Sequence, residues 1–227
     1  MFGTQRPLAA ILLWLLASRA LAGEPPRQIS FATADGGTSV ADAYGEGGGD
    51  GVVLAHGSAF DKESWRPLAE QLAAKDLRVL AIDFRGWGKS TAGAAKDALF
   101  EDLLAAVRYL HRGGAARVSL VGASMGGGAA AQAAARAAPG EIDRLVLLSP
   151  APVSAPEGIG GDKLVVASAN EPAVERIKAL YEKVPEPKRL VLLPGTAHAQ
   201  HIFRTDQSGR LTATIIEFLS RPATPAR

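Results

Sequence analysis

Short apolar runs alternate along the chain with segments of helix length. Most of these runs are almost continuous, which is typical of strands buried on both faces of a parallel sheet. The predicted buried strands are Val52–Ala55, Arg78–Ile82, Val118–Val121, Leu145–Leu148, Leu164–Ala167 and Leu190–Leu193. The segments between and after them predict helices at Trp65–Ala74, Ala98–His111, Met125–Ala138, Ala173–Lys183 and Leu211–Leu219.

Two further runs precede this alternation. Gln28–Thr33 and Ser39–Tyr44 are separated by Asp35-Gly36-Gly37, which predicts a β-hairpin at the edge of the sheet. The repeated order of strand and helix predicts an α/β fold, with a mostly parallel sheet of about eight strands and helices on both faces. About fifteen residues separate the strands that end at Leu148 and begin at Leu164, which is too few for a cap domain. We therefore expect an open site.

The first residues read as a targeting segment rather than as part of the fold. Arg6 supplies a positive charge, Pro7–Ala17 is apolar, and Ala20-Leu21-Ala22 has the small residues of a cleavage site. The apolar run is short for a membrane span. The pattern predicts a secretory signal at residues 1–22, a single domain at 23–227, and an exported product that is periplasmic or secreted without a stable membrane anchor.

Composition excludes several functions. Removal of the signal takes away Arg6 and Arg19 and leaves 23 basic residues against 23 acidic ones, so no basic excess marks a nucleic-acid surface. The chain has no cysteine, which excludes disulfides, a thiol nucleophile and a zinc–thiolate site. We expect no nucleic-acid partner; the oligomeric state is left open.

Gly122–Gly126 (GASMG) follows the predicted strand Val118–Val121 and precedes an alanine-rich helix. In this setting a G-x-S-x-G motif places its serine on a sharp turn, with the hydroxyl exposed at the carboxyl edge of the sheet. The start of a helix also favours developing negative charge. The motif alone is weak in a chain with 25 glycines, and its context makes Ser124 the candidate nucleophile.

Two other segments carry a resemblance to a known family. His56-Gly57-Ser58 follows the strand Val52–Ala55, and Ala81–Ser90 joins a strand to a loop with spaced glycines. With the serine motif, these segments resemble the α/β-hydrolase superfamily, in a small serine esterase or lipase-like form without a cap. The resemblance implies an oxyanion hole formed by the N–H groups of Met125 and Ser58, or alternatively Ala59. It also implies that His56 shapes the loop.

The base that activates serine is usually a histidine, since histidine titrates near neutrality. Besides His56, the chain has His111 at the end of a predicted helix, His198, and His201. His198 follows a Pro-Gly turn after the last core strand, which is where the resemblance implies the base. We predict His198, with His201 as the rival.

The third member of the triad is expected between the serine and the histidine in the chain. Glu171 lies at the carboxyl end of the strand Leu164–Ala167, whereas Glu141, Asp143 and Asp162 precede strands. By resemblance Glu171 is the acid, although aspartate is commoner at this position. Glu171 could instead only begin the helix that follows Pro172, and Asn170 is a weaker alternative.

These residues predict a serine hydrolase that cleaves carboxylic or thio esters through an acyl-enzyme, with a small-molecule ester as substrate and with neither metal nor organic cofactor. A lipase, a peptidase or a dienelactone-type hydrolase would use the same groups. The alternative from another class is a non-catalytic exported binding protein that retains the fold. The fold does not choose between these substrates.

Overall fold

A computed structural model of the chain describes residues 25–221. The predicted signal segment, residues 1–22, lies outside the described residues. Within residues 25–221, no helix is both long enough and apolar enough to cross a membrane.

Eight strands form one sheet in the order β1-β2-β4-β3-β5-β6-β7-β8. Their bounds are β1 Arg27–Ala32, β2 Thr38–Tyr44, β3 Gly51–Ala55, β4 Arg78–Asp83, β5 Val118–Ala123, β6 Arg144–Leu148, β7 Asp162–Ser168 and β8 Lys188–Leu193. All six predicted strands are confirmed, but the last of them, β8, lies at the edge of the sheet and only its Leu193 is buried. Most of them extend one or two residues further than predicted, since ladder hydrogen bonds continue into the flanking polar residues.

The edge hairpin is also confirmed. Strand β1 pairs with β2 in antiparallel fashion, and β2 pairs with β4 in the same way. Every other pair of neighbouring strands is parallel, from β4 and β3 through to β8. The sheet is therefore mostly parallel, as predicted, and β2 alone runs in the direction opposite to the other strands.

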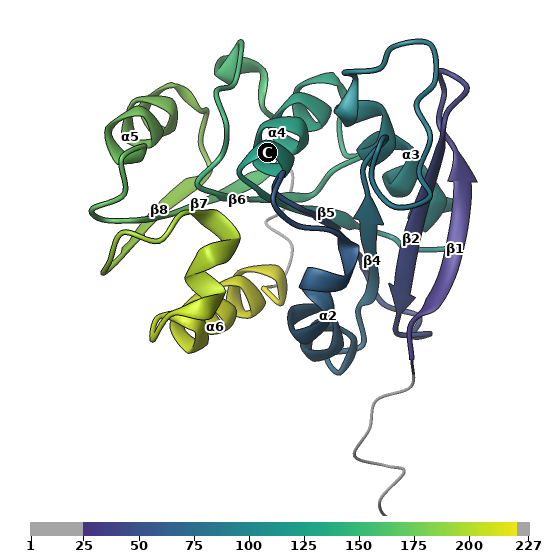
Figure 1. Cartoon of the computed structure of the whole chain (residues 1–227), viewed down its shortest axis with the longest axis horizontal. Helices are drawn as coiled ribbons and strands as arrows, with labels where there is room; N and C mark the ends of the chain where they lie inside the picture. Colours follow the sequence, from purple (N-terminus) through teal and green to yellow (C-terminus); the bar gives the residue numbers. More distant parts are fainter. Residues whose placement is uncertain (1–24, 222–227) are drawn as a thin grey trace, which may run out of the picture.

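Helices cover both faces of the sheet (Figure 1). Their bounds are α2 Arg66–Ala73, α3 Leu99–Arg112, α4 Met125–Arg136, α5 Val174–Lys183 and α6 Ser208–Leu219. One hydrophobic cluster joins α3, α4 and α5 to one face, and a second joins α2 and α6 to the other. Because both faces are covered, every residue of β3, β5 and β6 is buried.

Three short 3₁₀ helices were not predicted: η1 Lys62–Trp65, η2 Pro156–Gly158 and η3 Ala199–Arg204. They lie in segments that connect strands with helices or with other strands. The connection from β6 to β7 contains only η2, so within residues 25–221 no separate cap domain is inserted there. This agrees with the expected absence of a cap.

The strand order places the candidate site. Strand β3 lies between β4 and β5, so the connections that leave β3 and β5 diverge to opposite faces of the sheet. Ligands of open α/β sheets bind at such a switch point, beyond the carboxyl ends of the strands. The His56 loop follows β3 and Ser124 follows β5, so both lie at this point.

Candidate active site

Ser124 connects β5 directly to α4 and has an unusual backbone, with φ 50° and ψ −112°. Positive φ is uncommon outside glycine and marks local strain, which is frequent at functional sites. The neighbouring residues must be small: a Cβ on Gly122 would lie 2.3 Å from the Gly126 carbonyl oxygen. The GASMG motif thus forms the sharp strand-to-helix turn that the sequence predicts.

Ser124, His198 and Glu171 form one chain of hydrogen bonds. The distance from Ser124 Oγ to His198 Nε2 is 2.9 Å, and that from His198 Nδ1 to Glu171 Oε2 is 2.5 Å. The carboxylate can only accept, so Nδ1 carries the ring proton and Nε2 accepts from the serine hydroxyl. This is the geometry that a base needs to take a proton from the serine.

The carboxylate of Glu171 is completely buried, whereas 40% of the His198 side chain is exposed. Burial by itself would raise the pKa of Glu171, but hydrogen bonds from His198, Ser149 and the Ser168 N–H outweigh it. Ser149 Oγ lies 2.5 Å and the Ser168 nitrogen 3.0 Å from Oε1. The net effect lowers the pKa of Glu171, so the group that holds His198 is ionised at neutral pH.

Ser149 was not predicted from the sequence. It follows β6 at the carboxyl edge of the sheet, where a polar residue is a recognisable signal, but its partner is 22 residues away. Its hydroxyl also accepts from the Ala199 N–H at 3.2 Å. Ser149 therefore connects the acid loop with the histidine loop.

His56 is fully buried and does not reach the serine. Its Nδ1 lies 2.9 Å from the Gly57 carbonyl oxygen, and the Phe84 N–H donates to its Nε2 at 3.2 Å. A carbonyl only accepts and an amide only donates, so the ring is neutral with the proton on Nδ1. Burial lowers the pKa of His56 and favours this neutral form. His56 thus shapes the loop, as the resemblance implies.

The predicted oxyanion donors lie on both sides of the serine. Met125 is the first residue of α4, and Ser58 lines the same hollow as Ser124 and His198. Within residues 25–221, neither the Met125 N–H nor the Ser58 N–H donates to an acceptor in the chain. Ala59, the alternative donor, lines the same hollow.

The alternatives for the base and the acid lie elsewhere. The ring of His201 packs edge-on against Phe60 at 4.9 Å between centroids, and His198 alone reaches Ser124. Asn170 contributes its backbone N–H to the Gly195 carbonyl oxygen at 3.0 Å. Of each predicted pair, the structure places the preferred residue in the chain of hydrogen bonds that ends at Ser124.

Two surface hollows meet at Ser124. The histidine-side hollow, of about 150 Å³, is lined by Gly57, Ser58, Ala59, Phe60, Ser124, His198, Ala199, Gln200 and His201. The helix-side hollow, of about 270 Å³, is lined by Asp97, Leu99, Ser124, Met125, Gly128, Ala129, Gln132, Ala151 and Pro152. Each hollow is partly open to solvent, in keeping with the absence of a cap domain within residues 25–221.

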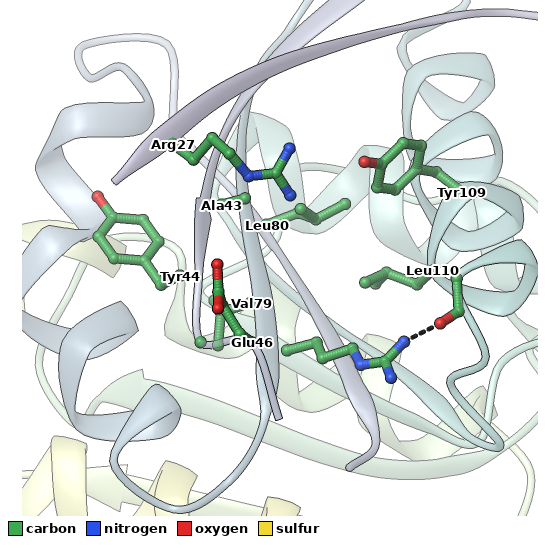
Figure 2. A pocket seen from close by; sticks show the side chains of 11 residues that line it. Arg27, Ala43, Tyr44, Glu46, Val79, Leu80, Tyr109 and Leu110 are labelled. Atoms are coloured by element: carbon green, nitrogen blue, oxygen red, sulfur yellow. Dashed lines mark hydrogen bonds between the residues drawn. The ribbon is translucent and has the colours of Figure 1, made fainter. Parts of the chain in front are cut away.

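A larger cavity of about 330 Å³ lies away from the serine, near the amino end of β4 (Figure 2). The side chains of Arg27, Glu46 and Tyr109 surround it, over a floor that includes Leu80 and Leu110. None of the groups bonded to Ser124 lines it. Across residues 25–221, no cluster of three or more His, Asp or Glu side chains could hold a metal ion.

Parts of the chain are similar to known hydrolases. A hydrolase of Acinetobacter baylyi, (E)-2-((N-methylformamido)methylene)succinate hydrolase, is 37% identical over 84 residues, which are 37% of this chain and 31% of that protein. Pimeloyl-[acyl-carrier protein] methyl ester esterase of Aliivibrio salmonicida is 32% identical over 124 residues, or 54% and 45% of the two chains. The chain thus spans less than half the length of these relatives.

Solved structures match over more of the chain. An esterase of Pyrococcus furiosus has a TM-score of 0.75 at 20% identity and covers 99% of this chain and 97% of its own. An esterase of Exiguobacterium antarcticum has a TM-score of 0.72 at 15% identity and covers 86% and 100%. Residues 51–177, more than half of the sequence, match the family model described as alpha/beta hydrolase fold. The chain therefore belongs to the α/β-hydrolase fold family.

Proposed function

We propose that this α/β hydrolase is a serine hydrolase that cleaves carboxylic or thio esters through an acyl-enzyme on Ser124. The observation that carries the proposal is the hydrogen-bonded chain from Ser124 Oγ through His198 to the buried carboxylate of Glu171. Each partner has the position that nucleophile, base and orienting acid require.

In this proposal His198 Nε2 takes the proton of Ser124 as its oxygen attacks the acyl carbon. Glu171 holds the imidazole tautomer and stabilises the imidazolium. The N–H groups of Met125 and Ser58 donate to the oxyanion of the tetrahedral intermediate. His198 then gives the proton to the leaving oxygen or sulfur. Water attacks the acyl-enzyme next, and His198 takes a proton from this water and returns it to Ser124 Oγ as the acid product leaves.

The two hollows suggest how an ester lies in the site. The leaving atom must come within reach of His198 Nε2, so the alcohol side belongs in the histidine-side hollow. The acyl group then lies in the helix-side hollow, against Leu99, Met125 and Ala129. We expect short and medium acyl chains to react fastest, because this open hollow of about 270 Å³ offers a longer chain no enclosed wall.

Covalent labelling tests the nucleophile. The purified protein should react with a fluorophosphonate probe and hydrolyse p-nitrophenyl acetate, and Ser124→Ala should abolish both. Glu171→Gln should lower kcat by about 10⁴-fold, as loss of the orienting acid does in other triads. His198→Ala should remove activity, whereas His201→Ala, which changes the lining of the hollow but no hydrogen bond to Ser124, should keep Ser124-dependent turnover. A wild type that neither labels nor turns over would favour the non-catalytic binding protein.

The substrate is tested with a series of p-nitrophenyl esters from acetyl to palmitoyl. The proposal expects kcat/KM to peak at short or medium chains, and a maximum at palmitoyl would instead favour a lipase. Export is tested by expression of the full chain in a bacterium. We expect a product outside the cytoplasm whose first residue is Gly23, and an uncleaved cytoplasmic product would refute this.

A further inference from the structure

Gln200 connects the two loops on which the proposed chemistry depends. It lies in η3, two residues after His198, and is 4% exposed. Its Oε1 accepts from the Gly57 N–H at 2.7 Å, 143 residues away in the chain. Its Nε2 donates to Ser64 Oγ at 2.9 Å. The side chain thus makes two hydrogen bonds to the segment that follows β3.

The bond to Gly57 fixes one side of the loop that carries the Ser58 N–H. The other side is fixed through the Gly57 carbonyl oxygen, which accepts from His56 Nδ1 at 2.9 Å and from the Phe60 N–H at 3.0 Å. Because the peptide is planar and trans, the Ser58 N–H must point away from that carbonyl. With both peptides of Gly57 held, the direction of this N–H is set.

Glycine alone would not hold this direction. A Cβ on Gly57 would meet only ordinary contacts, at 3.5 Å from the Ala123 carbonyl oxygen and 3.6 Å from Gln200 Oε1. Glycine is conformationally free, so neighbouring hydrogen bonds must select one conformation. The only side chain that binds the Gly57 N–H within residues 25–221 is that of Gln200.

We propose that Gln200 is a positioning residue. By holding the His56–Gly57 peptide through the Gly57 N–H, it restricts rotation at Gly57, so that the Ser58 N–H of the next peptide faces the oxyanion formed at Ser124. It thereby couples the oxyanion loop to the histidine loop from which it projects. This inference rests on the proposed function, since an oxyanion forms only if Ser124 attacks a carbonyl group.

The test replaces Gln200 with methionine, which has a similar length and no amide oxygen. An oxyanion donor acts in the transition state, and loss of one lowers kcat by about 10²–10³-fold. Because Gln200 holds the donor rather than being the donor, we expect Gln200→Met to lower kcat by about 10–100-fold with KM within about twofold. Gln71→Leu, an exposed glutamine of α2, is the matched control and should leave kcat unchanged.

A second readout separates positioning from a general structural defect. A thiono ester places sulfur, a weak acceptor, where the oxyanion forms. The wild type should prefer the oxo ester, and Gln200→Met should shrink the oxo-to-thiono ratio of kcat/KM by about tenfold. A structural defect alone lowers both rates alike and keeps the ratio, and that result would overturn the proposal. If Gln200→Met does not fold, Ser64→Ala tests the same ratio and must reduce it.

The two proposals fail in different ways. A wild type without Ser124-dependent turnover refutes the serine hydrolase, and the role of Gln200 falls with it. A wild type with Ser124-dependent turnover, together with a Gln200→Met variant of unchanged kcat and unchanged oxo-to-thiono ratio, refutes only the role of Gln200.

Discussion

Gly126 lies where α4 begins against the end of β3, and there is no room there for a side chain. A Cβ at this position would lie 2.4 Å from the Ala55 carbonyl oxygen and 2.6 Å from that of His56. Both are backbone atoms, so relief requires strand movement. We expect Gly126→Ala to lower the free energy of unfolding by about 3 kcal/mol, the upper end of usual overpacking costs, as measured by urea denaturation.

Gly209 provides the matched control. It lies in the first turn of α6, and a Cβ added there would meet no atom within 4 Å. Gly209→Ala should therefore raise stability by about 0.5–1 kcal/mol through the helix preference of alanine. Equal effects of the two substitutions would contradict the assignment of Gly126 to a steric role.

Ser149 offers a prediction about the acid. Ser149→Ala removes one of the hydrogen bonds that lower the pKa of Glu171, so the pKa of that carboxyl should rise. A hydrogen bond to a charged group contributes about 1.5–3 kcal/mol, so kcat should fall by about 10–100-fold if His198 loses its orientation. Kinetics across pH check this. Ser119→Ala, a buried strand serine remote from Glu171 in the chain, should leave kcat unchanged.

The sequence predicted residues whose roles follow from position along a strand. Ser124, Glu171 and His198 each follow a parallel strand at its carboxyl end, and such ends meet at one edge of the sheet. Gln200 and Ser149 could not be predicted in the same way, because their roles depend on partners 143 and 22 residues away. A loop residue has no periodicity to reveal such a partner.

At the scale of elements, Arg85 lies in the loop after β4 and connects this loop to the β1–β2 turn and to α3. Its guanidinium pairs with Asp102 at 2.9 Å and with Asp35 at 2.7 Å, and it is nearly fully buried. Burial opposes the charge of Arg85, but the bonds to both carboxylates outweigh it and raise the pKa of Arg85. Three segments distant in the sequence thus share one buried cation.

Removal of that cation leaves the fully buried carboxylate of Asp102 without its partner. We expect Arg85→Leu to lower the free energy of unfolding by about 3–5 kcal/mol, as is usual when one partner of a buried ion pair is lost. Urea denaturation measures the loss. The double variant Arg85→Leu with Asp102→Leu should recover part of the stability. An additive double variant would show that the pair is not coupled.

Elements were predictable to the extent that packing imposes a pattern on them. Strands β3 to β8 and helices α2 to α6 carry apolar runs or stripes because they pack in the core. The 3₁₀ helix η3 was missed because only three of its six residues are buried and no helical period extends over so short a length. The loops at the carboxyl edge of the sheet, which form the site, likewise have no hydrophobic period from which their conformation could be predicted.

At the scale of the whole molecule, buried titratable groups make stability depend on pH. The side-chain hydrogen bond from Arg85 and the one from Thr33 lower the pKa of Asp35, and the pKa of Glu171 is lowered as described above. A carboxyl with a lowered folded-state pKa contributes stability above its unfolded value, and that stability is lost as pH falls below about 4. Asp42 has the opposite effect on stability. Burial raises its pKa, so this carboxyl lowers the free energy of unfolding as pH rises above its ordinary value.

His56 acts at higher pH than the carboxyl groups with lowered pKa. Its pKa is lowered below the ordinary 6.5 by burial, so between these two values the unfolded chain binds more protons than the folded protein. Stability from neutral His56 is complete above pH 6.5 and is lost as pH falls through the folded-state pKa. Protonation would also remove the acceptor of the Phe84 N–H.

We therefore expect the free energy of unfolding to decline between pH 7 and pH 5 more steeply in the wild type than in His56→Gln. Loss of the buried ring should make the variant less stable at pH 7. Because glutamine cannot titrate, the variant should lose less stability on acidification. Asp42 is present in both proteins, so the difference between their slopes reports His56 alone. Urea denaturation at several pH values measures both slopes. His201→Gln, which alters an exposed ring, should keep the wild-type slope. Parallel curves for the wild type and His56→Gln would show that the folded protein tolerates a charged His56, against the neutral tautomer assigned from its hydrogen bonds.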